Sequence, residues 1–182
     1  MMYVVIGGLV LLLVLAIGMY NSLVSLRQQT ANAWGQIDVQ LKRRYDLIPN
    51  LVETVKAYMK HEGDTLERVI QARNMALQAN GVKEKAQAEA AVGAALTGIF
   101  GLAEAYPELK SNENMLSLQE ELKSTENKIA FARQYYNDIV TAYNTKTETF
   151  PSSIFAGMGG FKPKELFELE DAAARESVKV QF

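Results

Sequence analysis

Cysteine is missing from the 182 residues of this chain, and histidine occurs once, as His61. Without cysteine there is no disulfide, no thiolate nucleophile and no cysteine-ligated zinc or iron–sulfur site. A zinc-protease motif needs a second histidine four positions after the first, where this chain has Thr65. A di-iron helical bundle needs Glu-x-x-His pairs from two helices, which one histidine does not supply. The sequence therefore predicts no metal site and no cofactor.

An excess of positive charge is also absent, because 19 Lys and Arg residues stand against 21 Asp and Glu residues, a formal net charge of -2. Binding to phosphates needs a clustered basic surface. The longest basic run is Lys42-Arg43-Arg44. We therefore expect no nucleic-acid partner.

Proline is scarce, with 4 residues in the chain. Alanine, leucine, glutamate, lysine and glutamine are frequent, and their side chains lose little rotamer freedom in a helix. The composition therefore predicts an all-α protein.

Charged side chains are missing from the first 26 residues. About 20 apolar residues cross the roughly 30 Å hydrocarbon layer of a bilayer, which the stretch from Tyr3 to Tyr20 and its neighbours supply. Both tyrosines lie near its ends, where aromatic rings favour the headgroup region. A cleaved signal peptide has a basic leader and a shorter apolar core. Residues 1–22 are therefore predicted to be an uncleaved anchor of a single-pass protein of the cell membrane.

Basic residues follow this apolar run, first Arg27 and then Lys42, Arg43 and Arg44. An excess of Lys and Arg marks the cytoplasmic side of a membrane segment. We therefore expect the helical domain, residues 23–150, in the cytoplasm.

Apolar residues then recur at spacings of three and four, the period of one helical face. The first stretch continues the anchor to about residue 45, and the second runs from 48 to the turn signal Asn80-Gly81. The third covers residues 82–104. The last, residues 115–150, keeps a heptad-like spacing typical of a coiled coil. The anchor helix is thus expected to continue into a helical bundle.

A helix running unbroken from residue 1 to 79 would be roughly 120 Å long, so a compact domain needs a turn within it. One possible site is Asp46 to Pro49, where the proline removes a helix hydrogen bond. The other is Gly63, a helix stop before a capping-box-like sequence. A turn at Pro49 gives an up-and-down four-helix bundle, which we favour. A turn at Gly63 without reversal at Asn80-Gly81 gives three long helices. The predicted turn residues are Asp46, Pro49, Asn80, Gly81, Tyr106, Pro107, Phe150 and Pro151.

Residues 151–182 are predicted to form a flexible tail rich in Phe and Gly, since its glycines disfavour a regular buried helix. If the chain turns at Pro49, the fourth helix returns towards the bilayer and the tail begins near the membrane surface. Its apolar side chains and the basic pair of the first stretch are our candidate interaction residues. They are Phe155, Met158, Phe161, Phe167, Arg43 and Arg44.

Three stretches give the chain a specific resemblance to a known family: residues 33–44, AWGQIDVQLKRR; residues 46–52, DLIPNLV; and residues 104–110, EAYPELK. With shorter matches as far as Phe150-Pro151, the chain resembles the LemA family of bacterial membrane proteins. Gly63 departs from the family pattern, which favours a helix break there. The resemblance implies a membrane-anchored four-helix bundle of unassigned biochemical role, with some relatives linked to organising internal membranes. It transfers no catalytic residue.

We therefore expect a non-enzymatic scaffold or adaptor whose partners are the lipid bilayer and either further copies of itself or other membrane proteins. A membrane-tethered sensor that binds a small ligand inside the bundle is the alternative. An enzyme is less favoured, because carboxylates such as Glu120, Glu121 and Glu126 at this density usually form the solvated face of a helix.

Overall fold

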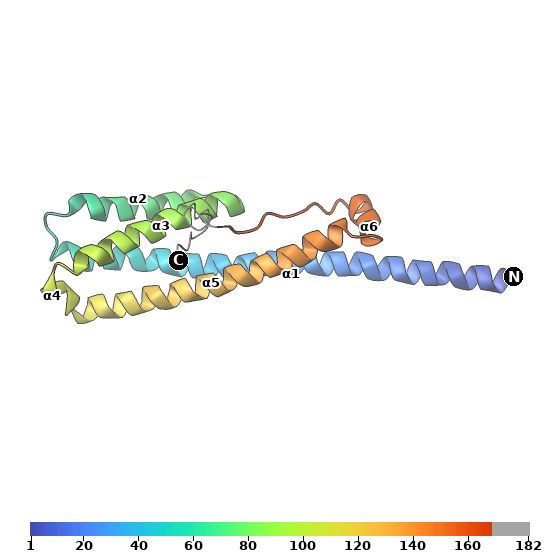
Figure 1. The fold of residues 1–182 in the computed structure, drawn as a ribbon, viewed down its shortest axis with the longest axis horizontal. Coiled ribbons are helices and arrows are strands. Elements are labelled where there is room, and N and C mark those ends of the chain that lie inside the picture. The colour runs from blue at the N-terminus through green and yellow to red at the C-terminus, as the bar shows by residue number, and fades with distance from the viewer. Residues whose placement is uncertain (169–182) are drawn as a thin grey trace, which may run out of the picture. The chain divides into compact units, whose positions relative to one another are not determined.

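The computed structural model describes residues 1–168, which contain helices and no strand (Figure 1). The all-α prediction is confirmed for this part of the chain. The helices are α1 (Met2–Lys56), α2 (Gly63–Gln78), α3 (Gly81–Ala103), α4 (Pro107–Lys110), α5 (Glu113–Glu148) and α6 (Ser152–Met158).

The chain divides into two compact units, and each is described by itself. The first, the anchor unit, consists of Met1–Val39 and Ile129–Leu166, so it holds the start of α1, the end of α5, and α6. The second, the bundle unit, comprises Gln40–Lys128 and, among the last described residues, Phe167 and Glu168. It holds the end of α1, all of α2, α3 and α4, and the start of α5.

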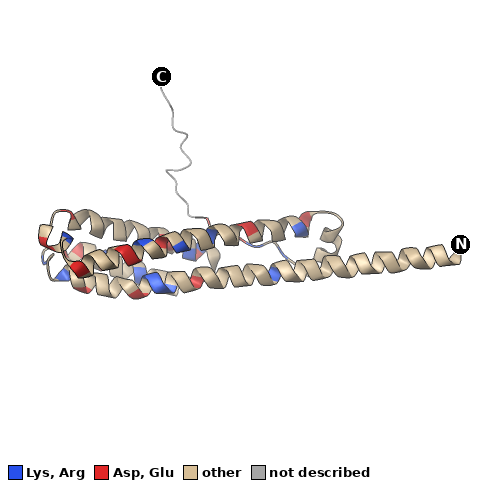
Figure 2. Ribbon diagram, turned by 90° about the horizontal axis from the view of Figure 1, so that it is seen from below, with Lys and Arg blue, Asp and Glu red and all other residues tan. Residues whose placement is uncertain are grey.

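The N-terminal part of α1 is long and apolar enough to cross a membrane, and none of its most apolar window is buried. Figure 2 shows this part without charged side chains, whereas both signs are interspersed on the bundle helices. The helix continues beyond the anchor into the domain, as predicted, but it runs without a break to Lys56 instead of ending near residue 45. α3 is also long and apolar enough to cross a membrane, and part of it is buried inside the protein.

The predicted turn at Asp46 to Pro49 is wrong, because Pro49 lies inside α1. A proline has no amide hydrogen, so Pro49 is not the usual donor partner of the Tyr45 carbonyl, four positions earlier. Arg73 of α2 replaces that partner by donating a hydrogen bond from Nε to the Tyr45 carbonyl at 2.8 Å. The helix therefore passes Pro49, and the first interruption lies at residues 57–62, just before Gly63.

The helix is interrupted again between Gln78 and Gly81. Gly81 has a φ of 83°, a left-handed conformation that other residues rarely adopt. α2 and α3 pack side by side and run in opposite directions (Figure 1). The three-helix alternative, which had no reversal at Asn80-Gly81, is therefore wrong.

The remaining predicted boundaries agree with the structure. Tyr106 precedes α4 and Pro107 is in its first turn, where a missing amide hydrogen costs nothing. Asn112 caps α5 by accepting a hydrogen bond from the Met115 amide on Oδ1 at 3.1 Å. Phe150 and Pro151 separate α5 from α6.

The heptad-like seam of the last long helix is buried along most of its length. Phe150, at its end, is instead 81% exposed. The buried seam residues are Met115, Leu122, Thr125, Ile129, Tyr136 and Tyr143.

The predicted flexible tail is wrong for residues 151–168, and residues 169–182 lie outside the described part. Residues 152–158 form α6, whose Gly157 lies in the last turn. Beyond α6, the side chain of Asn144 forms two hydrogen bonds with the backbone of Lys164. Its Nδ2 donates to the Lys164 carbonyl at 2.9 Å, and its Oδ1 accepts from the Lys164 amide at 2.8 Å. Two predicted tail residues, Phe161 and Phe167, are 6% and 1% exposed. They are core residues.

Candidate functional site

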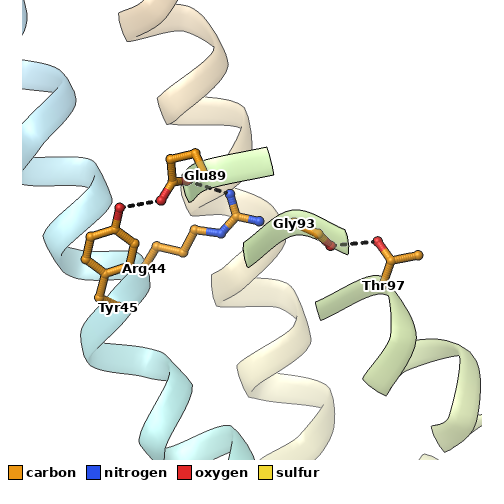
Figure 3. A network of polar contacts seen from close by, with 5 residues as sticks. All are labelled: Arg44, Tyr45, Glu89, Gly93 and Thr97. Carbon is orange, nitrogen blue, oxygen red and sulfur yellow. Dashed lines mark hydrogen bonds and ion pairs between the residues drawn. The ribbon is translucent and has the colours of Figure 1, made fainter. Parts of the chain in front are cut away.

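A buried polar cluster joins α1 to α3 in the bundle unit (Figure 3). Arg44 donates from Nη1 to Glu89 Oε2 at 3.2 Å, and the hydroxyl of Tyr45 donates to Glu89 Oε1. The side chains of Arg44 and Glu89 are 8% and 4% exposed. Burial raises the pKa of Glu89, and the hydrogen bond from Tyr45 and the charge of Arg44 offset this only in part.

Glu89 was not among the predicted site residues, although the sequence contains a signal for it. Glu89, Val92, Leu96, Ile99 and Ala103 follow one another at spacings of three and four, and all are buried. A lone carboxylate in such a row requires a polar or charged partner, because an unpaired buried charge is very costly. Of the two predicted basic residues, Arg44 is that partner.

A cavity of about 400 Å³ lies next to the guanidinium of Arg44, between α3 and α5. Arg44 Nε is buried without a hydrogen-bond partner in the described part of the chain. In Figure 3 the guanidinium lies beside Gly93, and a Cβ at that position would be 3.8 Å from Arg44 Nη2. The other lining residues are Leu96, Thr97, Phe100, Gln119, Leu122, Lys123 and Glu126. The guanidinium of Arg44 gives one side of the cavity a positive charge, and the walls combine apolar side chains with the polar ones of Gln119, Lys123 and Glu126.

An open groove of about 680 Å³ runs between α2 and α3 on the outside of the bundle unit. Its α3 wall is one helical face made mainly of small residues, with Leu102 at its end. Its α2 wall contributes Ala72 and Met75, and Met75 is 63% exposed. Polar side chains at one end are Glu62, Thr65, Arg68 and Gln71, and the small residues of α3 are Ala91, Ala94, Ala95 and Gly98.

A hydrophobic cluster in the anchor unit packs α6 and the residues after it against α1. Its buried members are Leu23, Tyr143, Ala156 and Phe161. The Phe161 ring meets the Tyr20 ring edge-on, with centroids 5.6 Å apart, and lies 4.9 Å from the guanidinium carbon of Arg27. Further along, Trp34 and Tyr136 pack with ring centroids 5.5 Å apart. Burial raises the pKa of both Tyr143 and Tyr136.

The structure separates the predicted interaction residues into two groups. Phe161, Phe167 and Arg44 are buried and are therefore not accessible to a partner. The two phenylalanines pack in the core, and Arg44 pairs with Glu89. Met158 is 82% exposed. Phe155 is half-buried against the Phe161 cluster, and Arg43 forms an exposed ion pair with Glu121 at 2.7 Å.

Side chains that could ligate a metal ion are scattered over the described helices. Within residues 1–168, no three His, Asp or Glu side chains gather closely enough to hold a metal ion.

Comparison with known proteins gives relatives that span most of the chain. Protein LemA of Metamycoplasma hominis is 28% identical over 139 residues, which cover 74% of this chain and 62% of the relative. Two proteins of Paramagnetospirillum magneticum, magnetosome proteins MamQ 1 and MamQ 2, are each 24% identical over 179 residues, 84% of this chain and 66% of theirs. The chain thus spans about two thirds or less of the length of these relatives.

The model of the LemA family matches residues 33–182. The match contains the three stretches that gave the resemblance, and it includes the α1, α3 and α5 residues that line the polar cluster and its cavity. It covers well over half of the chain, so the chain belongs to the LemA family.

Proposed function

We propose that this protein is a membrane-anchored, non-enzymatic scaffold whose helical bundle assembles with further copies of itself. The observation that carries the proposal is the groove between α2 and α3. Its α3 wall presents Ala91, Ala94, Ala95 and Gly98 to the outside along one face, and the residues from Ala90 to Ala103 carry no charge. Small residues at this spacing let a second helix approach closely.

The anchor in this proposal is the start of α1 alone. α3 is apolar enough to span a bilayer, yet it carries Glu89, which pairs with Arg44 and Tyr45 of α1. Its opposite sides contact α2 and line the cavity towards α5. We therefore infer a single pass, followed by an up-and-down helical bundle. Arg27 and the basic residues 42–44 favour the cytoplasmic side for the bundle.

A second copy of this chain is the partner that fits the groove best. Two α3 faces made of Ala and Gly are self-complementary, so a two-fold axis between them lets each copy supply the same contacts. Two relatives carry the name magnetosome protein, and we propose that an assembly of this chain organises the membrane that holds it.

Disulfide cross-linking of the full chain in membranes tests this proposal directly, because the chain has no native cysteine. Gly98→Cys places the thiol in the groove, where an added Cβ meets no atom within 4 Å. Two α3 faces in close contact bring the Cα atoms of the two introduced cysteines within the roughly 4.4–6.8 Å that a disulfide needs. We expect mild oxidation to convert most of the Gly98→Cys protein to a covalent dimer on a non-reducing gel.

Ser124→Cys is the matched control, because Ser124 is exposed on α5 and outside the groove. It should stay monomeric under the same oxidation. Equal dimer yields for the two variants, or no dimer from Gly98→Cys, would reject self-assembly through the groove.

A ligand sensor is the second candidate function, and the unpartnered Nε of Arg44 beside a cavity favours it. The positive guanidinium and the apolar side chains of the walls suit a small carboxylate with a short alkyl chain, so octanoate is a suitable probe. We expect octanoate to raise the melting temperature of the full chain in detergent in a saturable way. Thr97→Leu, which fills the cavity, should abolish this rise without lowering the melting temperature of the free protein. An equal rise in both proteins would exclude the cavity as the site.

A further inference from the structure

The short helix α6 places an apolar surface beside the point where α1 leaves its apolar run. Ser152 and Ala156 form the buried side of α6. Its opposite side exposes Ile154 at 52% and Met158 at 82%, and Phe150, four positions before Ile154, is 81% exposed. Exposed apolar side chains that gather in this way usually mark an interaction surface.

Contacts within the anchor unit fix the level of α6 along α1. Phe161 touches Tyr20 and Arg27, and the cluster that holds Ala156 includes Leu23. Residues 20–27 of α1 extend roughly 10 Å along the helix axis. Tyr20 ends the apolar run, so α6 lies within about one headgroup layer of the hydrocarbon boundary. Figure 1 shows α6 beyond the end of α5, next to this part of α1.

The charge around α6 fits a lipid surface. Between Glu148 and Glu165 the chain carries no acidic residue, while Lys162 and Lys164 are basic. Arg27 lies against the face of Phe161 on the same side of the unit. Basic residues next to an interfacial apolar surface are attracted to anionic headgroups.

We propose that α6 is an interfacial membrane helix, with Phe150, Ile154 and Met158 inserted into the boundary between headgroups and acyl chains of the bilayer that holds α1. The inference rests on the membrane anchor of the proposed function and not on self-assembly. A helix of 7 residues is too short to bind a bilayer by itself. The anchor unit holds α6 at the bilayer surface. The effective concentration of lipid around α6 is therefore high, so α6 needs little affinity of its own for the bilayer.

Depth-dependent fluorescence quenching of the full chain in liposomes tests this inference. Met158→Cys carries a single environment-sensitive fluorophore, and Leu12→Cys, inside the apolar run, is the reference for a label in lipid. Gln134→Cys is the matched control, because Gln134 is exposed on α5 of the same unit. Tyr136, two positions away, pairs with Trp34, roughly 20 Å along α1 from Tyr20.

With quenchers attached near the headgroup end of the acyl chain, the label at position 158 should lose about half of its emission or more, because an interfacial helix lies only about 5–10 Å deep. The label at position 134 should keep its emission. The quenching at position 158 should increase when phosphatidylglycerol is added to phosphatidylcholine liposomes.

Two results overturn the inference. In the first, the lipid quenchers act on the label at position 158 no more than on the control, and aqueous iodide quenches it. This result would show that α6 is exposed to water. In the second, neither the lipid quenchers nor iodide reach the label, which would show that protein, here a second copy of the chain, covers α6. Neither result alters the cross-linking of Gly98→Cys, so failure of this inference is distinguishable from failure of self-assembly.

Discussion

Replacing Glu89 with alanine is expected to reduce the free energy of unfolding by about 3–5 kcal/mol, because the substitution leaves the buried charge of Arg44 without its partner. Arg44 is 8% exposed and has Glu89 as its hydrogen-bond partner, and Tyr45 loses its acceptor as well. For a chain of this size each kcal/mol corresponds to about 2–4 °C in melting temperature. Thermal unfolding of the full chain in detergent, followed by circular dichroism, measures the loss.

The ion pair between Arg43 and Glu121 is a natural control. It comes from the adjacent residue of α1 and is shorter, at 2.7 Å, but its side chains are 51% and 40% exposed. Exposed pairs contribute about 0–1 kcal/mol, so Glu121→Ala should change the melting temperature little. The double substitution Arg44→Met with Glu89→Leu removes both buried charges and should recover much of the loss. If Glu89→Ala and Glu121→Ala lowered the melting temperature equally, the burial of the pair between Arg44 and Glu89 would not increase its contribution to stability.

The pH dependence of stability follows from the same burial. The pKa of Glu89 is raised above its ordinary value of 4.5, so the folded protein binds this proton more tightly than the unfolded chain. The stability that protonation contributes is complete below 4.5 and is lost as the pH rises through the raised pKa. The difference in melting temperature between the natural protein and Glu89→Gln should therefore shift in favour of the natural protein as the pH falls from neutral towards 4.5.

Phe161→Ala is expected to release α6 and the residues after it from the anchor unit. Phe161 is 6% exposed and packs against Tyr20, Leu23 and Tyr143. Truncating a buried phenylalanine costs about 3–5 kcal/mol. The other contacts of the segment with α5 include hydrogen bonds from Tyr136 to the Glu165 carbonyl and from Asn144 to Lys164. The expected loss in free energy exceeds the roughly 0.5–1.5 kcal/mol that each of these hydrogen bonds contributes.

Hydrogen exchange of the Gly159 and Phe161 amides measures this release, since they donate to the carbonyls of Phe155 and Ala156 at 2.9 Å. Because 1.4 kcal/mol corresponds to a factor of ten, exchange at position 161 should accelerate by about a hundredfold or more. Met158→Ala, at an exposed neighbouring position, should leave both amides protected. If Phe161→Ala left them protected too, the cluster around Leu23 would not be what holds α6.

The helical faces and most boundaries could be predicted from the sequence because they depend on local patterns. The buried residues of α1, from Leu23 through Ala33, Ile37 and Leu41 to Tyr45, follow the predicted spacing. Pro107 suits the first turn of α4 through its own fixed φ, so it was recognisable as a turn residue from the sequence.

The errors arise where a distant residue decides the local structure. Pro49 has the usual properties of a helix breaker, and a hydrogen bond from Arg73 on another helix supplies the donor that the proline lacks. The glycines after α6 do not make the tail flexible, because Asn144 and the cluster around Phe161 hold that segment. Sequence periodicity contains no information about such contacts. The membrane-proximal position that we expected for residues 151–161 was derived from a turn at Pro49 that the structure does not have, so it stays a prediction.

The hydrogen bond between Arg73 and the Tyr45 carbonyl also bears on how the chain matures during synthesis. Residues leave the ribosome in order, so the stretch around Pro49 emerges before the arginine that completes it. Until α2 docks, the Tyr45 carbonyl lacks the hydrogen bond from Arg73, so we expect the segment after Pro49 to fray more easily. We therefore expect the last turns of α1 to become stable when α2 packs against them. The formation of this part of the helix then depends on a tertiary contact.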